Sequence, residues 1–321
     1  MAIVKPENMD FSDKTFSMII YGSPGIGKTT LALSAPDPIL LDFDRGISRV
    51  RSAHRKDTSV CNSYKEVLQD LASPDMRNYK TVVIDTGGSL VTFLKEWAME
   101  EKGAKTKSGE FNSLKGFGFV KTEWNSLTEY IKTTLRKNVI FVFHSNEEKD
   151  KDGNPIQRLV CEGSARNIVW TPCDFGGYMQ MIDNRRVICF TPEQEFFAKG
   201  CHGIVGRIPV PELKDDTRND FVTRLFEKAK ANIDAEAAEF APVKEKYSMT
   251  METVRTIIDG VTDLESANTA LQVLPDLDHA LTSKKEASAM LMTKTKQLGL
   301  KYDQASGSFV KPEEKPEEGG D

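Results

Sequence analysis

Runs of consecutive apolar residues recur along the first half of the chain, separated by segments with helical spacing. Four of these runs predict buried strands, at residues 15–21, 38–44, 79–86 and 138–144. Between them, the spacing of apolar residues predicts helices at residues 63–71, 90–101 and 120–136. Because strands that alternate with helices build parallel sheets, we predict an α/β fold with a mostly parallel central sheet.

In the second half of the chain the sequence pattern changes from short apolar runs to helical spacing, and then to an acidic end poor in apolar residues. Apolar runs at 156–160, 177–182, 186–191 and 194–199 predict short, partly antiparallel strands, and a helix near 218–234 closes a core of residues 1–233. An Ala-, Glu- and Pro-rich stretch at 234–247 is interpreted as a linker, followed by a small C-terminal helical region at 248–300. Residues 301–321 are interpreted as a disordered acidic tail, because their end is rich in Glu and Pro and poor in apolar residues.

Composition excludes several classes of protein. The chain has 321 residues, of which 39% are apolar and 28% charged, as in ordinary globular proteins. No apolar run approaches the roughly 18 residues of a membrane span, and the first residues lack the pattern of a signal peptide. The five cysteines form no C-x-x-C pair, which favours reduced thiols in a cytoplasmic protein. A net charge of −5 argues against a surface coated for nucleic acid, although local basic loops are compatible with it.

The most informative motif joins the first predicted strand to a helix. Residues 22–29 fit G-x-x-x-x-G-K-[ST], the phosphate-binding P-loop, at the strand-to-helix turn that this motif requires. We therefore predict a site for ATP and Mg²⁺, in which Lys28 contacts the β- and γ-phosphates and Thr29 binds the metal. The alternative is a chance match in a Gly-rich turn. The expected nucleotide-binding residues are Gly22, Ser23, Pro24, Gly25, Ile26, Gly27, Lys28, Thr29 and Thr30.

Two acidic residues follow neighbouring predicted strands. Asp85 ends the third strand, where P-loop proteins place a carboxylate that holds Mg²⁺, and the alternative is a solvated strand end. The next residue is Thr86 rather than a glutamate, so a carboxylate that activates water must come from elsewhere. Asp44, after the second strand, is our candidate, because the ends of adjacent parallel strands open on one crevice. Asp44 as a helix cap, or as an ion-pair partner of a nearby arginine, is an equally weighted alternative.

In this order of motifs the chain resembles phage nucleotide-binding proteins with a minimal RecA-like core, a group that includes the single-strand annealing recombinases of the Sak type. The resemblance covers residues 12–230 and rests on segments 22–30, 41–46, 84–86, 115–120 and 142–144. It implies a RecA-like P-loop ATPase core and a homo-oligomer with nucleotide near the subunit interfaces. It also implies action on single-stranded DNA during phage recombination or replication, in the cytoplasm of a bacterial host. A single-strand-binding or replication protein is a further expected partner, and no membrane is expected.

The resemblance also implies roles for single residues. His144 ends the fourth predicted strand, where RecA-like cores carry a polar residue that senses the γ-phosphate. Lys199 matches a lysine that reaches the ATP of a neighbouring subunit. Cys201 stands where an arginine is usual, so Lys199 acts alone, Arg207 substitutes, or hydrolysis is slow. A strand cap at His144 and a surface lysine at position 199 are the alternatives.

A basic and aromatic segment is our candidate for DNA contact. Residues 102–121, interpreted as a loop, carry five lysines and one acid, interleaved with phenylalanines. Lysines follow a phosphate backbone and aromatic faces stack on bases without reading sequence. The alternative is a solvated loop whose phenylalanines pack on the core. The expected DNA-binding residues are Lys105, Lys107, Lys115, Phe117 and Phe119.

Three functions remain open on these observations. The first is an ATP-hydrolysing RecA-like protein that acts on single-stranded DNA. The second is a nucleotide-dependent switch or loader for another replication protein, which the negative net charge and the absent arginine favour. The third, a small-molecule kinase, is weaker because the chain has no clear arginine cluster for a lid. The step from ATPase to DNA depends on analogy of fold.

Overall fold

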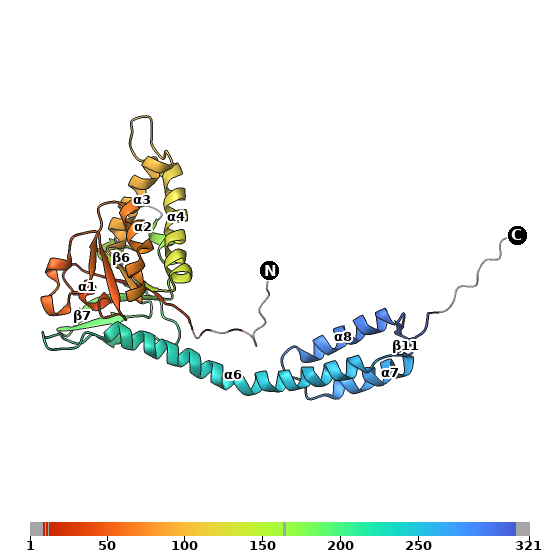
Figure 1. The fold of residues 1–321 in the computed structure, drawn as a ribbon. Helices are drawn as coiled ribbons and strands as arrows, with labels where there is room; N and C mark the ends of the chain where they lie inside the picture. Colours follow the sequence, from red (N-terminus) through yellow and green to blue (C-terminus); the bar gives the residue numbers. More distant parts are fainter. Residues whose placement is uncertain (1–8, 10, 12, 163–164, 313–321) are drawn as a thin grey trace. The chain divides into compact units, whose positions relative to one another are not determined.

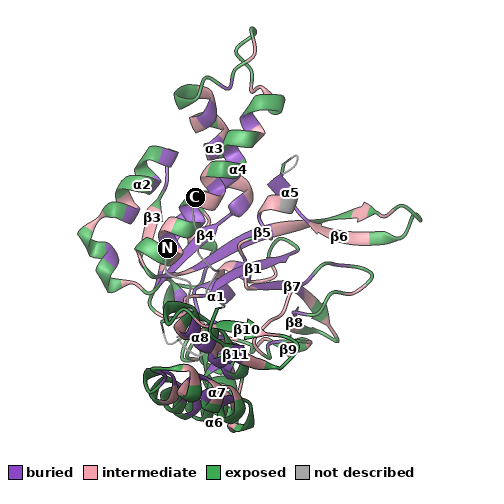
Figure 2. Ribbon diagram, turned by 90° about the vertical axis from the view of Figure 1, so that its right-hand side faces the viewer, coloured by how far each residue is buried: buried purple, intermediate pink, exposed green. Residues whose placement is uncertain are grey.

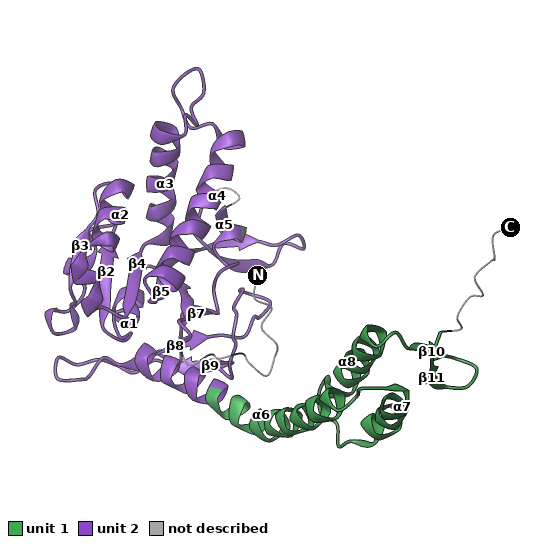
Figure 3. Ribbon diagram, turned by 45° about the vertical axis from the view of Figure 1, so that its right-hand side comes forward, with its two compact units in different colours: residues 1–9, 234–321 green, residues 10–233 purple. Residues whose placement is uncertain are grey.

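The computed structural model describes residues 9, 11, 13–162 and 165–312. The end of the expected acidic tail, residues 313–321, lies outside them. The chain divides into two compact units, residues 10–233 and residues 234–321 together with residues 1–9 (Figure 3). Each unit is described by itself.

A nine-stranded sheet forms the centre of the first unit, in the order β3-β2-β4-β5-β1-β7-β8-β9 with β6 paired to β5 (Figure 1). Neighbouring strands pair parallel along β3-β2-β4-β5-β1-β7. Strands β6, β8 and β9 pair antiparallel. The predicted mostly parallel central sheet is thus confirmed. The strands are β1 Ser17–Gly22, β2 Pro38–Asp42, β3 Thr58–Val60, β4 Thr81–Asp85, β5 Asn138–Lys149, β6 Pro155–Leu159, β7 Phe175–Ile182, β8 Arg185–Cys189 and β9 Arg207–Pro209.

Side chains alternate between the two faces of β1 and bury both. Ile19 and Tyr21 belong to one apolar cluster, and Met18 and Ile20 to another. The first cluster lies under helices α2 to α5, and the second under α1 and the start of α6 (Figure 2). A strand covered on both faces must be apolar throughout, which explains the continuous runs in the sequence. The helices of this unit are α1 Lys28–Ala32, α2 Tyr64–Ala72, α3 Gly87–Glu101, α4 Ser113–Glu129, α5 Ala165–Ile168 and the start of α6 Phe221–Asp259, with short helical turns at Ile47–Arg49, Ser52–His54, Pro74–Asn78 and Tyr130–Thr134.

Helices α3 and α4 form an arm, and of the loop expected at residues 102–121 only 102–112 is a loop, because 113–121 belong to α4. The two helices lie side by side, and residues 102–112 connect them at the tip of the arm (Figures 1 and 2). Asn112 caps α4 by accepting a hydrogen bond from the amide of Lys115. Gly116 and Gly118 suggested a loop, yet both lie inside α4. The phenylalanine ring of Phe111 packs against Gly116, so this glycine makes room for a tertiary contact.

The second unit is helical with one small hairpin. Residues 234–247, interpreted as a linker, are helical and belong to α6 Phe221–Asp259, with Pro242 inside the helix. Ala and Glu favour helix strongly, which outweighs the single proline. Residues 301–310, expected to be disordered, form a hairpin whose Phe309 is buried and whose backbone is bound by Asn268. Its elements are α7 Leu264–Val273, the turn Leu274–Asp276, α8 Ser283–Gln297, β10 Lys301–Asp303 and β11 Ser308–Val310.

Among the described residues, none of the helices combines the length and the apolar character that crossing a membrane requires.

The two glycines of α4 provide a test of the arm. A methyl group at Gly118 meets open space, whereas one at Gly116 would lie 2.3 Å from the Phe111 ring. We expect Gly118→Ala to stabilise the protein by about 0.5–1 kcal/mol through helix propensity. Gly116→Ala loses part or all of that gain, because Phe111 must move. Thermal unfolding of both variants measures the difference, and equal or greater stability of Gly116→Ala would contradict this packing.

Candidate functional site

The site is built at the carboxyl ends of four adjacent strands. Gly22 of β1 pairs with His144 of β5, and Asp85 of β4 pairs with Val142 of β5 and with Asp42 of β2. In parallel strands this register brings the residues that follow each strand to one edge of the sheet. The P-loop, His144, Asp85 and Asp44 therefore come together, as the sequence predicted for that edge.

The P-loop needs its glycines for distinct reasons. At Gly22 a Cβ atom would lie 2.3 Å from the carbonyl oxygen of Met179 on β7, so no side chain fits. Gly25 and Gly27 adopt φ angles of 78° and 99°, which L-residues with side chains rarely adopt. Helix α1 is only five residues long. Its dipole is correspondingly small, and the backbone N–H groups of the loop are the main anion-binding feature.

Lys28 is buried at the centre of the site, with 5% of its surface exposed. Its Nζ donates a hydrogen bond to the carbonyl oxygen of Ser23 at 2.8 Å and lies 3.4 Å from Nδ1 of His144. Burial lowers the pKa of Lys28 to about 8, although the nearby Asp85 carboxylate opposes this shift. Neither bonded partner carries a negative charge, so the ammonium is poorly compensated in the free protein.

Thr29 and Asp85 form the candidate metal site. The Thr29 hydroxyl donates to Oδ2 of Asp85 at 2.5 Å. Burial raises the pKa of Asp85, the Thr29 hydrogen bond opposes the increase, and the neighbouring carboxylates Asp44 and Asp42 add to it. A buried carboxylate beside other carboxylates and a hydroxyl offers the hard oxygen ligands that Mg²⁺ prefers, so these residues fit that ion.

His144 joins the P-loop to Asp44. Its Nδ1 faces the Lys28 ammonium, which can only donate, so Nδ1 must accept and Nε2 carries the proton. Nε2 lies 4.0 Å from Oδ2 of Asp44. Burial and then the charge of Lys28 lower the pKa of His144, with a smaller contribution from Arg49, whereas Asp44 opposes the shift. The imidazole is therefore neutral near pH 7 and responds to the position of Lys28.

Three polar residues of this edge were not predicted. Ser89, in the first turn of α3, donates to Oδ1 of Asp44 and holds that carboxylate. Thr86 caps α3 through its hydroxyl. The buried Asp42 accepts hydrogen bonds from the amides of Gly46 and Ile47, at 2.8 and 2.9 Å, and shapes the loop that carries Asp44. The sequence offered two signals for these three residues. One is the acid two residues before Asp44, and the other is the T-G-G-S run of residues 86–89.

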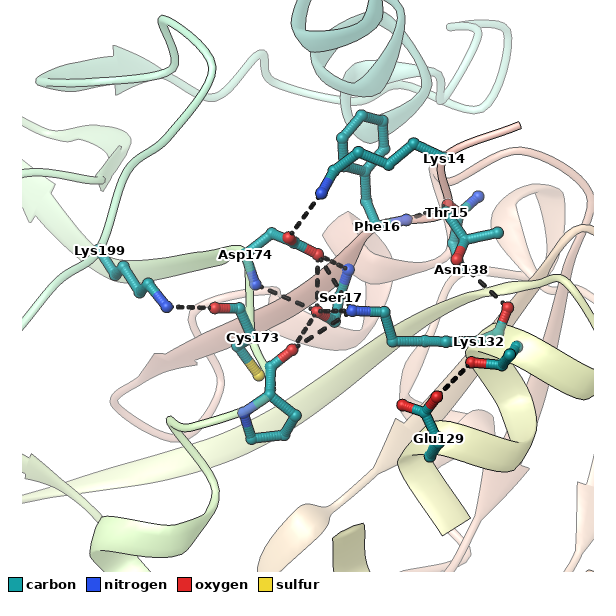
Figure 4. A network of polar contacts seen from close by, with 12 residues as sticks. Lys14, Thr15, Phe16, Ser17, Glu129, Lys132, Asn138, Cys173, Asp174 and Lys199 are labelled. Atoms are coloured by element: carbon teal, nitrogen blue, oxygen red, sulfur yellow. Dashed lines mark hydrogen bonds and ion pairs between the residues drawn. The ribbon is translucent and has the colours of Figure 1, made fainter. Parts of the chain in front are cut away.

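Lys199 does not join this group in the same chain. It pairs with Gly176 near the start of β7, and its Nζ donates to the carbonyl oxygen of Cys173 at 2.5 Å. Cys173 precedes a network around Asp174, Ser17 and Lys132 at the beginning of β1 (Figure 4). The P-loop follows the other end of β1. Arg207, the alternative, is engaged by the Glu193 carboxylate.

The predicted DNA-binding residues all lie on the arm. Lys105, Lys107 and Lys115 are exposed, and Phe119 has 38% of its surface exposed. Phe117 is different, because it packs edge-on against Phe111 and against the apolar cluster beneath α4. Four of the five residues are thus exposed.

A cavity of about 240 Å³ borders the P-loop and was not foreseen. It is lined by Gly25, Gly27 and Thr30, together with three arginines. These are Arg49, Arg51 and Arg186. A larger cavity of about 1000 Å³, lined by Phe16, Pro38 and Asn138, includes no P-loop residue. We consider the smaller cavity the relevant one, because it adjoins the phosphate-binding backbone.

The lowered pKa of Lys28 predicts how nucleotide affinity depends on pH. Below about pH 8 the free protein carries the ammonium, and above it the amine is neutral and attracts phosphate weakly. We expect the affinity for ATP to fall by up to about tenfold per pH unit above that value. Equilibrium binding of a fluorescent ATP analogue from pH 7 to about pH 9.5 measures this.

Lys28→Ala is the control for that titration, because it lacks the group that loses its proton. Its affinity should be low and level across the same range. A level affinity in the wild-type protein would show that free Lys28 keeps its proton there.

The chain was compared with curated proteins, solved structures and protein-family models. No curated protein shows a significant match to the sequence. Among solved structures, a KaiC-like protein from the hyperthermophilic archaeon Pyrococcus horikoshii is similar, with 14% identity and a TM-score of 0.36. The similarity covers 61% of this chain and 89% of that chain. A family model described as an AAA domain matches residues 14–202, which is more than half of the chain, and the protein belongs to this family.

Proposed function

We propose that this protein binds ATP with Mg²⁺ and hydrolyses it slowly. The observation that carries the proposal is the meeting of Lys28, Thr29, Asp85, His144 and Asp44 at the edge of the sheet beside the P-loop. The P-loop cradles phosphates, and Thr29 and Asp85 would hold the metal. When bound, Mg²⁺ neutralises charge on the phosphates.

Each side chain has a role that follows from its contacts. Lys28 exchanges Ser23 and His144 for phosphate oxygens. Asp44, held by Ser89, orients and deprotonates the attacking water. His144 regains a free Nδ1 when Lys28 turns to the phosphates, so the state of the site reaches the β5–β6 hairpin through this ring.

We further propose that the partner is single-stranded DNA, bound at the tip of the arm during phage recombination or replication by a homo-oligomer in the host cytoplasm. The exposure of Lys105, Lys107, Lys115 and Phe119 on the arm supports this proposal. Lysines can bind the phosphate backbone of DNA, and an accessible aromatic ring can stack on a base. Neither contact requires a particular DNA sequence. The resemblance to annealing recombinases points the same way.

A nucleotide-dependent switch or loader is the second candidate. Two observations favour it: Lys199 and Arg207 are both engaged within their own chain, and Thr86 stands where a catalytic glutamate is usual. Both features are consistent with slow ATP hydrolysis. Slow hydrolysis suits a switch, because the protein then stays in its ATP-bound state for longer.

Phosphate release measured with and without single-stranded DNA tests the first candidate. We expect DNA to raise the rate of the wild-type protein. Asp44→Asn keeps ATP binding and lowers hydrolysis by about 10²–10⁴-fold, because the general base is lost. Asp37→Asn, at an exposed residue paired with Lys80, should leave the rate unchanged. Tight ATP binding without any effect of DNA would favour the switch.

A charge reversal on the arm tests where DNA binds. The triple variant Lys105→Glu, Lys107→Glu and Lys115→Glu should lose DNA affinity by an order of magnitude or more at moderate salt. Its matched control reverses three exposed lysines of α8, which are Lys284, Lys285 and Lys296. Fluorescence anisotropy with a labelled oligonucleotide compares the two. Equal losses in both variants would indicate that only the net charge matters and would contradict a site on the arm.

A further inference from the structure

Arg186 on β8 is held against the P-loop although 160 residues separate it from the loop in the chain. Its Nε donates to the carbonyl oxygen of Ile26 at 2.9 Å. The same nitrogen lies 3.6 Å from the position that a Cβ atom of Gly27 would occupy. Arg186 is half-buried. The guanidinium is thus fixed beside the backbone that precedes Lys28.

The charge of Arg186 is not neutralised by the protein. Among the described residues, its one side-chain hydrogen bond goes to a neutral carbonyl group, and no carboxylate pairs with it. The cavity beside it is lined by three arginines and a single carboxylate, Glu212. Arg51 pairs with Asp215 at 3.5 Å, at a well-exposed position. Positive charge therefore accumulates beside a loop that already attracts anions.

Arginine presents five N–H donors in a planar fork. One of those of Arg186 is occupied by Ile26, which leaves the two terminal nitrogens. Two parallel N–H groups match the oxygens of a phosphate. In a P-loop the backbone surrounds the α- and β-phosphates, whereas the lysine reaches the β- and γ-phosphates. Arg186, beside Ile26 and Gly27, therefore lies near the expected position of the α- and β-phosphates.

We propose that Arg186 binds the α- and β-phosphates of the nucleotide in the same chain, using its terminal nitrogens while Nε stays on Ile26. This inference rests on the nucleotide binding proposed above and adds a contact to it. ATP and ADP share these two phosphates, so Arg186 contributes to the binding of both.

The test measures equilibrium affinity, not turnover. ATP, ADP and inorganic tripolyphosphate compete against a fluorescent nucleotide on the full-length protein. Arg186→Ala should weaken all three by about 10–100-fold, the range expected for hydrogen bonds to a charged group. Arg186→Lys should recover part of the affinity. Arg185→Ala, which removes the neighbouring exposed arginine of the same strand, should bind as the wild type does.

Other outcomes overturn the inference. Undiminished binding by Arg186→Ala would do so while leaving nucleotide binding intact, whereas failure of the wild-type protein to bind any probe would overturn both proposals. A loss for ATP and tripolyphosphate but not for ADP would place the contact at the γ-phosphate. A loss for ATP and ADP but not for tripolyphosphate would place it at the nucleoside.

Arg186→Gln separates direct contact from support of the loop. Its side-chain amide can still donate to Ile26 but carries no charge. Binding as weak as that of Arg186→Ala supports contact with phosphate. Full recovery would mean that Arg186 acts only through the conformation of the loop, and would overturn the proposal.

Discussion

The position of β5 between β1 and β4 is the constraint on which the site depends. Hydrogen bonds on both sides of β5 set Gly22 beside His144 and Val142 beside Asp85. A shift of one residue in either pairing would turn the side chains of β5 to the opposite face. The apolar clusters on both sides of the sheet oppose such a shift, because every residue from Val139 to Phe143 is buried. The packing of the core thereby sets the geometry of the charged groups at its edge.

Electrostatic coupling follows from that register. Lys28, His144, Asp44 and Ser89 form a continuous series of polar contacts from the P-loop to the first turn of α3. Lys28, His144 and Ser89 lie on α1, β5 and α3, whereas Asp44 lies in the loop that follows β2. His144 is a neutral imidazole with the Lys28 ammonium on one side and the Asp44 carboxylate on the other. A ligand that draws Lys28 away alters the hydrogen bonding of His144 without any change in the sheet.

Local patterns made the central strands and the P-loop predictable. A strand buried on both faces leaves an apolar run, and the P-loop has glycines at fixed spacing. Arg186 and Ser89 were not predictable in this way, because sheet pairing and a helix start bring them from 160 and 45 residues away. The start of α4 was predicted as a loop because it contains Gly116. This glycine makes room for the ring of Phe111 and does not form a turn. The continuous helix at 234–247 was misread because Ala and Glu are common in linkers and helices alike.

The buried ammonium of Lys28 links folding to the supply of nucleotide. Its hydrogen bonds go to a carbonyl and to a neutral imidazole, so in the free protein only the nearby Asp85 carboxylate offsets part of its charge. A polyphosphate supplies the missing counter-charge and binds only the folded chain. By mass action, the folded population then rises with ligand concentration. A bound nucleotide would thus stabilise the fold whether or not it is hydrolysed.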